Sequence, residues 1–461
     1  MIRLSELRES TPWLGLDALR ALKEGPDAIE ARQRRRLADL VTFARANSPY
    51  YRLLYRSLSQ DVDDVAYLPV TDKKSLMACY DDWATDRDVT LDHVQEIADN
   101  AERTGDYFLG KYTVRATSGT TGFRGIFVTD SRSESVGKAL ALRAASAWLG
   151  AGDLLRIAAR GGRMGFVVHG SGHGVASVVA TRLRKGRFGR RQFAMFSLQS
   201  SLERTVSQLN RFRPAILLSY ATEATLLADE QEEGRLEIAP LLVILTGEGL
   251  STKENGRVRE AFHTRVVSTY ASNECSFMTY SCPAGWLHVN SDWVVAEPVD
   301  QNYRAVPPGV ESHTLLISNL ANRVQPVLRY DIGDRAVLRP DPCTCGSPLP
   351  AIRINGRTTE VLYIPTAHGQ LRAIPPGAFG DLNHVPGLDT FQIAQTAPTT
   401  LRFRFRTRAD ADPEQVWRSA EDLSRRILVE HKIENVTFQR ADEPPALTPG
   451  GKLPRIIAAR E

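Results

Sequence analysis

The stretch from Ala116 to Gly125, with the sequence Ala-Thr-Ser-Gly-Thr-Thr-Gly-Phe-Arg-Gly, contains residue types that can surround phosphate groups. Glycine allows a tight turn, and the backbone N–H groups and hydroxyls of such a turn can donate hydrogen bonds to phosphate oxygens. The stretch lacks the Gly-x4-Gly-Lys-Ser/Thr spacing, which excludes a Walker-type nucleotide hydrolase. Taken alone, a loop of this composition is more often a simple connection than a ligand site.

Cys282, His288, Cys343 and Cys345 form a second candidate set. Three thiolates and one imidazole suit tetrahedral Zn²⁺, and Cys-x-Cys-Gly can form a tight ligand turn. The spacing is not that of a common zinc finger, so reduced, buried cysteines with a core histidine remain the alternative. With four protein ligands, no position is open for a substrate, and the site would be structural.

Four further short motifs follow the glycine-rich loop in chain order. They are Tyr270-Ala-Ser-Asn-Glu274, Tyr330-Asp-Ile-Gly-Asp334, Gly356-Arg-Thr-Thr-Glu360 and Pro449-Gly-Gly-Lys452. Together with the loop, they resemble the signatures of the adenylate-forming superfamily, the acyl-CoA synthetases and their relatives, in the same order. Five collinear motifs are improbable as a coincidence, whereas any one of them is weak evidence.

Within the superfamily, the chain is most similar to the phenylacetate–CoA ligase branch. Leu68-Pro-Val-Thr-Asp-Lys73, preceded by Ser48-Pro-Tyr-Tyr51, is similar to the N-terminal pattern of that branch. Leu245-Thr-Gly-Glu248 resembles its adenine-pocket segment, and the resemblance covers residues 40–460. Members of the branch often carry a structural zinc at the place of the cysteine and histidine set, which favours zinc here.

The resemblance implies ATP-dependent adenylation of a carboxylic acid, with release of pyrophosphate. In this role Glu274 would bind the Mg²⁺ that bridges the phosphates, and Asp334 would accept hydrogen bonds from both ribose hydroxyls. Glu248, Tyr270 and Asn273 would contribute to the nucleotide pocket. The implied contacts to the β- and γ-phosphates are Thr117, Ser118, Gly119, Thr120, Thr121 and Gly122. The structural alternatives are a loop glutamate for Glu274 and a turn residue for Asp334.

Two basic residues complete the implied catalytic set. Arg357 would lie near the ribose at the junction of two domains, and Lys452 would reach the α-phosphate and the acyl carboxylate. Considered alone, Lys452 would be a solvated residue of the C-terminal tail. Because the small C-terminal domain of this superfamily rotates between half-reactions, Lys452 would act only in the first, with the hinge at Thr359 and Glu360.

The acyl pocket is expected in the segment Gly165 to Gly174 and at Ala271, which replaces the usual glycine of its motif. His169, Gly172 and His173 are the candidate substrate contacts, although both histidines could equally be structural. The remaining histidines give no arrangement that would support a Ser/His/Asp triad.

Two departures from the family pattern bear on the reaction. The phosphate loop usually continues Gly-x-Pro-Lys, whereas Arg124 stands here, and we expect its charge to replace that of the lysine. The stretch Pro365 to Pro376 replaces the short glycine-containing loop that enters the site of CoA-using members. Adenylation is therefore better supported than transfer to CoA.

The elements that must position these residues follow from hydrophobic periodicity. We expect helices over the first 65 residues, and Thr71 or Asp72 as the N-cap of a later one. Apolar runs at 165–169, 215–218 and 241–245, separated by helices at 132–148 and 202–212, indicate buried strands of an α/β sheet. Strands at 391–395, 400–407 and 434–439, with a helix at 413–430, indicate a separate α+β unit.

We therefore expect the α/β architecture of adenylate-forming enzymes. Residues 1–356 would form a large N-terminal adenylation domain with a zinc-binding insert around 282–345, and residues 357–461 a small, mobile C-terminal domain that carries Lys452. A homodimer is compatible with the resemblance, although no residue supports it.

Composition excludes several classes of protein. The 461 residues include 58 Lys and Arg against 54 Asp and Glu, a net charge of +4 that is spread along the chain, which argues against nucleic-acid binding. The densest basic run, Arg402 to Arg408, alternates with apolar residues and predicts a surface strand with a solvated basic face. No long apolar stretch or secretory signal is present, so we expect no membrane span and a cytoplasmic protein. Five cysteines, odd in number, do not fit a disulfide framework.

The function favoured by the sequence is adenylation of an acid, aromatic by analogy with the branch, followed by transfer to CoA. The expected cofactors are ATP, Mg²⁺, structural Zn²⁺ and CoA. An amine or a carrier-protein thiol as acceptor, or ATP-dependent diazotisation of an aromatic amine with nitrite, stays open because of the altered 365–376 stretch. A nucleotide-binding protein without catalysis is the third class, and the retained Glu274, Asp334, Arg357 and Lys452 argue against it.

Overall fold

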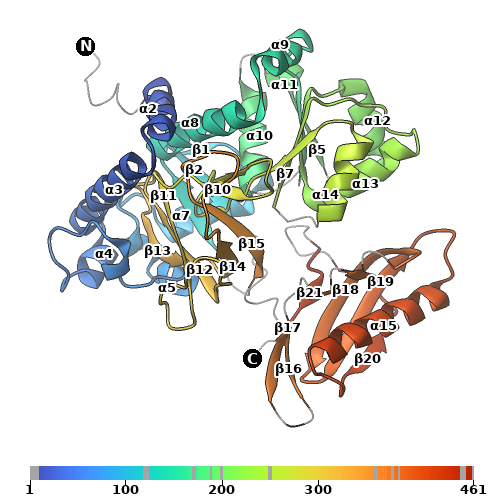
Figure 1. Ribbon diagram of the computed structural model, residues 1–461. Helices are drawn as coiled ribbons and strands as arrows, with labels where there is room; N and C mark the ends of the chain where they lie inside the picture. Colours follow the sequence, from blue (N-terminus) through green and yellow to red (C-terminus); the bar gives the residue numbers. More distant parts are fainter. Residues whose placement is uncertain are drawn as a thin grey trace.

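Figure 1 shows the computed structural model of the chain. It describes residues 10–117, 124–168, 173–186, 189–197, 201–247, 252–357, 362–366, 368, 370–374, 378–379, 381–382, 385–446 and 453–458.

Five parallel strands form the central sheet, in the order β5-β4-β6-β7-β8. The strands are β4 (Met164–Val168), β5 (Phe193–Ser197), β6 (Ile216–Tyr220), β7 (Leu242–Thr246) and β8 (Arg265–Ser268). The helices around them are α8 (Ser131–Trp148), α9 (Ala151–Ala159), α10 (Val175–Lys185), α11 (Gly189–Gln192), α12 (Leu202–Phe212), α13 (Ala221–Glu232) and α14 (Thr252–Ala261). The expected strands and helices of this region are confirmed to within a few residues.

Both faces of this sheet are buried, because apolar side chains point to either side of its strands. Val167, Leu217 and Val243 pack under α12, α13 and α14 on one face. Phe166 contacts α10, and Ile244 packs against α8, on the other face. Since successive side chains of a strand point to opposite faces, continuous apolar runs are what a sheet covered on both sides requires.

Chain order reverses between β4 and β6, because β5 lies on one side of β4 and all later strands lie on the other. In open parallel sheets, ligands bind outside the carboxyl ends of the strands at such a reversal. This edge is where residues after β4, β6, β7 and β8 meet.

Helices and antiparallel sheets complete the large N-terminal part. Its first helices are α2 (Thr11–Glu24), α3 (Pro26–Asn47), α4 (Pro49–Leu54), α5 (Lys73–Ala78), α6 (Tyr80–Trp83) and α7 (Leu91–Asp99). Its antiparallel strands are β1 (Tyr107–Phe108), β2 (Tyr112–Ala116), β3 (Ile126–Thr129), β9 (Thr279–Ser281), β10 (Leu287–Val289), β11 (Val294–Val299), β12 (Thr314–Asn319), β13 (Val327–Asp331), β14 (Asp334–Leu338) and β15 (Ala351–Arg357). Asp72 caps α5, as expected, whereas Thr71 pairs with Tyr330.

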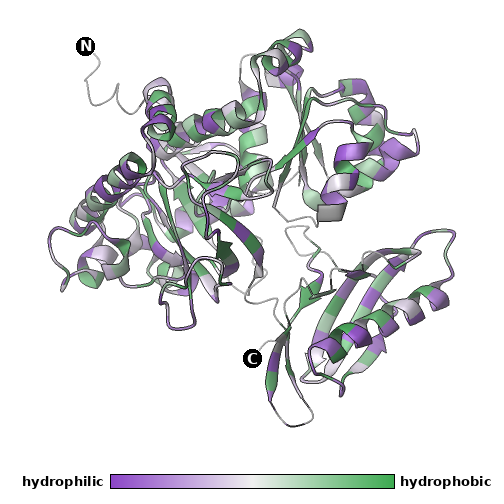
Figure 2. Cartoon of the chain, in the orientation of Figure 1, coloured by the Kyte–Doolittle hydropathy of each residue, from purple (hydrophilic) through white to green (hydrophobic). Residues whose placement is uncertain are grey.

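The smaller C-terminal part has its own apolar core between residues 362 and 456. Its elements are β16 (Leu362–Pro365), β17 (Leu371–Ile374), β18 (Leu388–Ala397), β19 (Thr400–Thr407), α15 (Pro413–Glu430), β20 (Thr437–Arg440) and β21 (Ile456–Ile457). Figure 2 shows alternating hydrophobic and hydrophilic residues along α15, which packs one face on the sheet β20-β19-β18-β21. Arg455 joins this part to the larger one, because its guanidinium lies 3.3 Å from Glu254 of α14.

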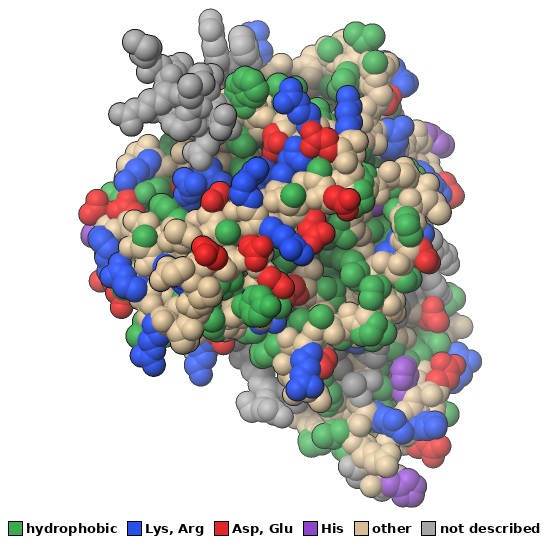
Figure 3. All heavy atoms as spheres, turned by 60° about the vertical axis from the view of Figure 1, so that its left-hand side comes forward, with side chains coloured by type: hydrophobic (Ala, Val, Ile, Leu, Met, Phe, Trp, Pro, Cys, Tyr) green, Lys and Arg blue, Asp and Glu red, His purple; other side chains and the backbone are tan. Residues whose placement is uncertain are grey.

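Charge is mixed on the face that carries the N-terminal helices, where Figure 3 shows basic and acidic side chains interspersed. Within the described ranges, no helix combines the length and the hydropathy that crossing a bilayer requires.

Candidate active site

Two of the motif segments follow neighbouring strands of the parallel sheet. Gly247 comes directly after β7, and Tyr270 comes two residues after β8. Gly247 has a φ of +80°, and a Cβ there would lie 2.7 Å from the ring of Tyr220 at the end of β6, so only glycine suits this turn. The next residue, Glu248, lies outside the described residues.

Tyr270 and Asp334 meet although 64 positions separate them. The Tyr270 hydroxyl donates a hydrogen bond to Oδ2 of Asp334, and the Tyr270 backbone N–H donates to the Thr279 hydroxyl at 3.0 Å. Asp334 is buried at the start of β14, where its register partner on β15 is Arg357. The structure therefore brings Tyr270 and Asp334 together through their side chains, and Asp334 and Arg357 through their backbones. The side chain of Arg357 is outside the described part.

Glu274 is buried and held by a residue that the sequence did not single out. The Tyr330 hydroxyl donates to Glu274 Oε1 at 3.2 Å, and Asn319 Nδ2 donates to the Glu274 backbone carbonyl at 3.0 Å. Burial, and then the charge of Glu274, raise the pKa of Tyr330 well above its usual value, so this phenol stays a donor. Tyr330 is the first residue of its motif, which was the available signal.

The ends of the phosphate loop are joined in a closed base. Thr117 N–H donates to the Gly125 carbonyl at 2.8 Å, and Gly125 N–H donates to the Thr117 hydroxyl at 2.8 Å. Asn273 Nδ2 donates to the Ala116 carbonyl at 3.1 Å, which ties this base to the segment that carries Glu274. The loop residues themselves, Ser118, Gly119, Thr120, Thr121 and Gly122, lie outside the described residues.

Arg124, which we expect to replace the lysine of the loop, contacts α7 in this structure. Its guanidinium binds the carboxylate of Asp99 and the Ala98 carbonyl, so its charge is already paired. A different cation flanks the loop base, since a Cβ at Gly125 would lie 3.5 Å from Cδ of Lys73. Lys73 belongs to the N-terminal pattern, which by itself does not indicate that this lysine lies beside the loop.

The acyl-pocket candidates are only partly described. His173 is buried, its Nε2 lies 3.1 Å from the Asn100 carbonyl, and its own carbonyl accepts from Ala116 N–H. His173 therefore makes at least one structural contact, through its backbone, with the residue that precedes the glycine-rich loop. Ala271 is half-buried next to Tyr270, whereas His169 and Gly172 lie outside the described residues.

The cysteine and histidine set is brought together, with the four ligand atoms within 4.8 Å of one another. Cys282 Sγ lies 3.6 Å from Cys343 Sγ, and His288 Nε2 lies 3.1 Å from Cys345 Sγ. Two thiolates on one tetrahedral zinc are about 3.8 Å apart, given Zn–S bonds of about 2.3 Å. The arrangement therefore fits a zinc ion in size and donor type.

The surroundings of His288 prepare it for such a role. Its Nδ1–H donates to the Leu349 carbonyl at 2.9 Å, which leaves Nε2 with its lone pair toward the cysteines. Burial lowers the pKa of His288, so the imidazole is neutral. Burial alone would raise the pKa of Cys343, but the hydrogen bonds from Cys345 and Cys282 and the charge of Arg339 together outweigh burial and lower the pKa, which favours a thiolate.

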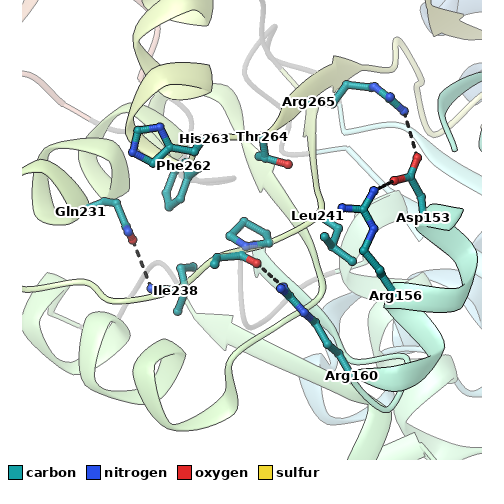
Figure 4. A pocket seen from close by; sticks show the side chains of 12 residues that line it. Asp153, Arg156, Arg160, Gln231, Ile238, Leu241, Phe262, His263, Thr264 and Arg265 are labelled. Atoms are coloured by element: carbon teal, nitrogen blue, oxygen red, sulfur yellow. Dashed lines mark hydrogen bonds and ion pairs between the residues drawn. The ribbon is translucent and has the colours of Figure 1, made fainter. Parts of the chain in front are cut away.

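A hollow of about 400 Å³ lies at the opposite edge of the sheet, at the amino ends of β7 and β8. Figure 4 shows Arg156 and Arg265 both directed at Asp153, while Arg160 reaches a backbone carbonyl. None of the predicted site residues that the structure describes lines this hollow. It is therefore separate from the motif residues at the carboxyl edge.

No protein-family model and no curated protein matches this sequence. Among solved structures, 2-hydroxyisobutyryl-CoA ligase in the postadenylation state, in complex with 2-HIB-AMP, aligns with a TM-score of 0.67 and 19% identity, over 94% of this chain and 90% of that one. The chain has the fold of adenylate-forming ligases. The anthranilate CoA ligase AuaEII, with 14% identity over 74% of this chain and 65% of that one, aligns with a TM-score of 0.52. Fatty acyl-adenylate ligases from E. coli and L. pneumophila also give a TM-score of 0.52, with 14% identity over 74% of this chain and 67% of that one.

The same 2-hydroxyisobutyryl-CoA ligase in its thioesterification state gives a TM-score of 0.53 and 19% identity, over 95% of this chain and 90% of that one. Lys452 lies outside the described residues.

Proposed function

We propose that the protein is an AMP-forming enzyme that adenylates a carboxylic acid with ATP, releases pyrophosphate and then transfers the acyl group to CoA. The observation that carries this proposal is the convergence of Tyr270, Glu274 and Asp334 beside the closed base of the phosphate loop. Tyr270 and Glu274 belong to one motif and Asp334 to another, and the contacts join both motifs to the loop base at the edge of the sheet where this fold class binds ligands.

Catalysis of this reaction is mostly positioning and charge neutralisation, because the attacking carboxylate and the α-phosphate are both negative. Asp334 has two carboxylate oxygens, which suit the vicinal diol of a ribose. Tyr270, beside Asp334, would flank the adenine ring. Arg357, opposite Asp334 in the β14–β15 register, would lie near the same ribose. Lys452 would neutralise charge at the α-phosphate.

Glu274 would hold the Mg²⁺ that accompanies ATP, and carboxylate oxygen is the donor type that Mg²⁺ prefers. Its position next to Asn273, which is bonded to the base of the glycine-rich loop, supports this role. The metal would supply charge neutralisation for the departing pyrophosphate. The hydrogen bond from Tyr330 would orient the carboxylate toward that ion.

We predict that Tyr330→Phe weakens binding of Mg²⁺–ATP by about 10-fold, since hydrogen bonds to charged groups contribute about 1.5–3 kcal/mol. The aromatic ring and its contact with Phe127 remain, so the fold is retained. Titration calorimetry with Mg²⁺–ATP measures the change.

Tyr303→Phe is the matched control, because the Tyr303 hydroxyl donates to a different carboxylate, that of Asp331, at 3.2 Å in an exposed position. Its affinity for Mg²⁺–ATP should stay near that of the parent. Equal losses in both variants, or no loss in Tyr330→Phe, would contradict the role given to Glu274.

The branch and the acceptor belong to the same proposal. The N-terminal pattern and the geometry of the cysteine and histidine set support the phenylacetate–CoA ligase-like branch, an aromatic acid and a structural zinc. An amine, a carrier-protein thiol or diazotisation remains an alternative to CoA. The support for these alternatives is that β16 and β17 form an antiparallel hairpin, where CoA-using members have a short glycine-containing loop. We propose that residues 357–461 form the domain that rotates between the half-reactions. We also expect the protein to be cytoplasmic.

Pyrophosphate release with ATP and Mg²⁺ tests the proposal across a panel of aromatic and aliphatic acids, with and without CoA. Thioester detected by mass, with turnover only when CoA is present, is the expected result. Release without thioester would indicate an amine or carrier-thiol acceptor, and release only with nitrite and an aromatic amine would indicate diazotisation. Silence across the panel with ATP still bound would contradict the proposal in favour of a non-catalytic nucleotide-binding protein.

A further inference from the structure

Gln392 lies in β18 with its side chain fully buried, and its amide makes four hydrogen bonds. Nε2 donates to the Ala446 carbonyl at 3.0 Å and to the Pro454 carbonyl at 2.9 Å. Oε1 accepts from Ala446 N–H at 3.2 Å and from Arg404 Nη1 at 2.9 Å. Every donor and acceptor position of the amide is therefore used.

The two backbone partners of Gln392 lie on either side of the terminal motif. Ala446 immediately precedes residues 447–452, which are outside the described part, and Pro454 is two positions beyond Lys452. One side chain thus joins the chain before the motif to the chain after it. The chain after the motif is held again where Ile393 N–H donates to the Arg455 carbonyl at 2.8 Å and β21 pairs with β18.

Two further side chains determine how the Gln392 amide is turned. Arg404 donates to Gln392 and, through Nε, to Glu443 Oε1 at 3.0 Å, while Arg402 donates to Glu443 Oε2 at 2.8 Å. Because a guanidinium only donates, it requires the amide oxygen on its side and so directs Nε2 at the two carbonyls. The basic face of β19 is predicted from the sequence to be solvated. Two of its residues, Arg402 and Arg404, instead form ion pairs with Glu443.

We propose that Gln392, oriented by Arg404, is a positioning residue for Lys452. Pro454 is two positions beyond Lys452 in the sequence, so an anchor on the Pro454 carbonyl limits how far the ammonium can lie from it. Gln392 also holds the chain before the motif, at Ala446. The inference rests on the proposed function, in which Lys452 acts in adenylate formation and not in the transfer step.

Gln392→Met tests this, because methionine has a similar length and makes none of the four hydrogen bonds. We expect pyrophosphate release to fall about 10–100-fold in kcat, as a displacement of about 1 Å can cost 10²-fold, with little change in KM for ATP. Transfer to the acceptor from supplied acyl-adenylate, measured without ATP, should keep the parent rate. A merely structural role would lower both steps together.

Gln395→Met is the matched control on the same strand. Gln395 is also buried, and its Nε2 donates to the Tyr363 carbonyl at 2.9 Å and the Pro398 carbonyl at 3.0 Å. These bonds do not involve the terminal motif, so this variant should slow neither step. Gln392→Glu serves if the methionine variant fails to fold, since it retains the contact with Arg404 and loses both donors.

Amide hydrogen exchange tests whether Gln392 holds the chain around the terminal motif, independently of the rate of adenylation. Backbone amides of residues 446–458 should exchange faster in Gln392→Met than in Gln395→Met, starting with Ala446, whose N–H is bonded to Gln392. Unchanged exchange, or adenylation that falls no further than in the control, would overturn the inference. If Lys452→Ala itself leaves pyrophosphate release unchanged, the catalytic role of Lys452 fails, and exchange alone decides whether Gln392 anchors the motif. Absence of pyrophosphate release from the parent protein would instead contradict the proposed function.

Discussion

Replacing Lys452 by alanine should slow adenylate formation by roughly 10²–10³-fold, the loss of about 3–4 kcal/mol expected when one stabilising contact to developing charge is removed. The acid and the α-phosphate repel each other, and the ammonium offsets that repulsion only as they approach. The affinity for ATP should therefore change little. Pyrophosphate release and calorimetric titration with Mg²⁺–ATP measure the two quantities separately.

The control for Lys452→Ala is Arg418→Ala, which removes a positive charge from the exposed side of α15 in the same part of the chain. We expect parent-like pyrophosphate release from it. Loss of ATP binding in Lys452→Ala would show a role in binding instead of catalysis. Parent-like pyrophosphate release from Lys452→Ala would contradict the catalytic assignment.

Removing the proposed zinc should have the largest effect on stability. We expect about one zinc per chain in the purified protein, and Cys343→Ser should lower both the zinc content and the Tm, by roughly 5–10 °C for a loss of a few kcal/mol. The reason is that the metal would join the β9–β10 hairpin, which carries Cys282 and His288, to the distant segment that carries Cys343 and Cys345. Elemental analysis and thermal unfolding measure the two effects.

Cys79→Ser is the control, because Cys79 is exposed and far in sequence from the set. It should retain zinc and Tm. If Cys343→Ser retains the parent Tm and the parent protein contains no zinc, the alternative of reduced, buried cysteines holds. A parent-like rate of adenylation at low temperature in Cys343→Ser would support a structural role for the metal.

The elements of the fold were accessible from local pattern. The apolar runs that became β4, β6 and β7 and the periodic stretches that became α8, α12 and α15 are properties of short windows of sequence. The residue types of the motifs were accessible for the same reason, because each motif is a few residues long. Even the N-cap at Asp72 follows from its immediate neighbours.

Contacts with distant partners could not be predicted from local pattern. Arg124 has the charge that the phosphate loop requires, yet its guanidinium pairs with Asp99, a residue at the end of α7. The basic run on β19 alternates as a surface strand does, yet Arg404 binds Gln392 and Glu443. In both cases the local pattern was correct, and the partner was supplied by another element.

Local patterns are enough to assign the strands and helices and to identify the residue types available for chemistry, because hydrophobic period and short motifs involve neighbouring residues. Which of those residues meet depends on the folded chain. The bond from Tyr330 to Glu274, the orientation of His288 by Leu349 and the anchoring of Ala446 and Pro454 by Gln392 each join positions dozens of residues apart. Such contacts depend on strand order, register and helix packing, which arise only when the whole chain buries its apolar surface together.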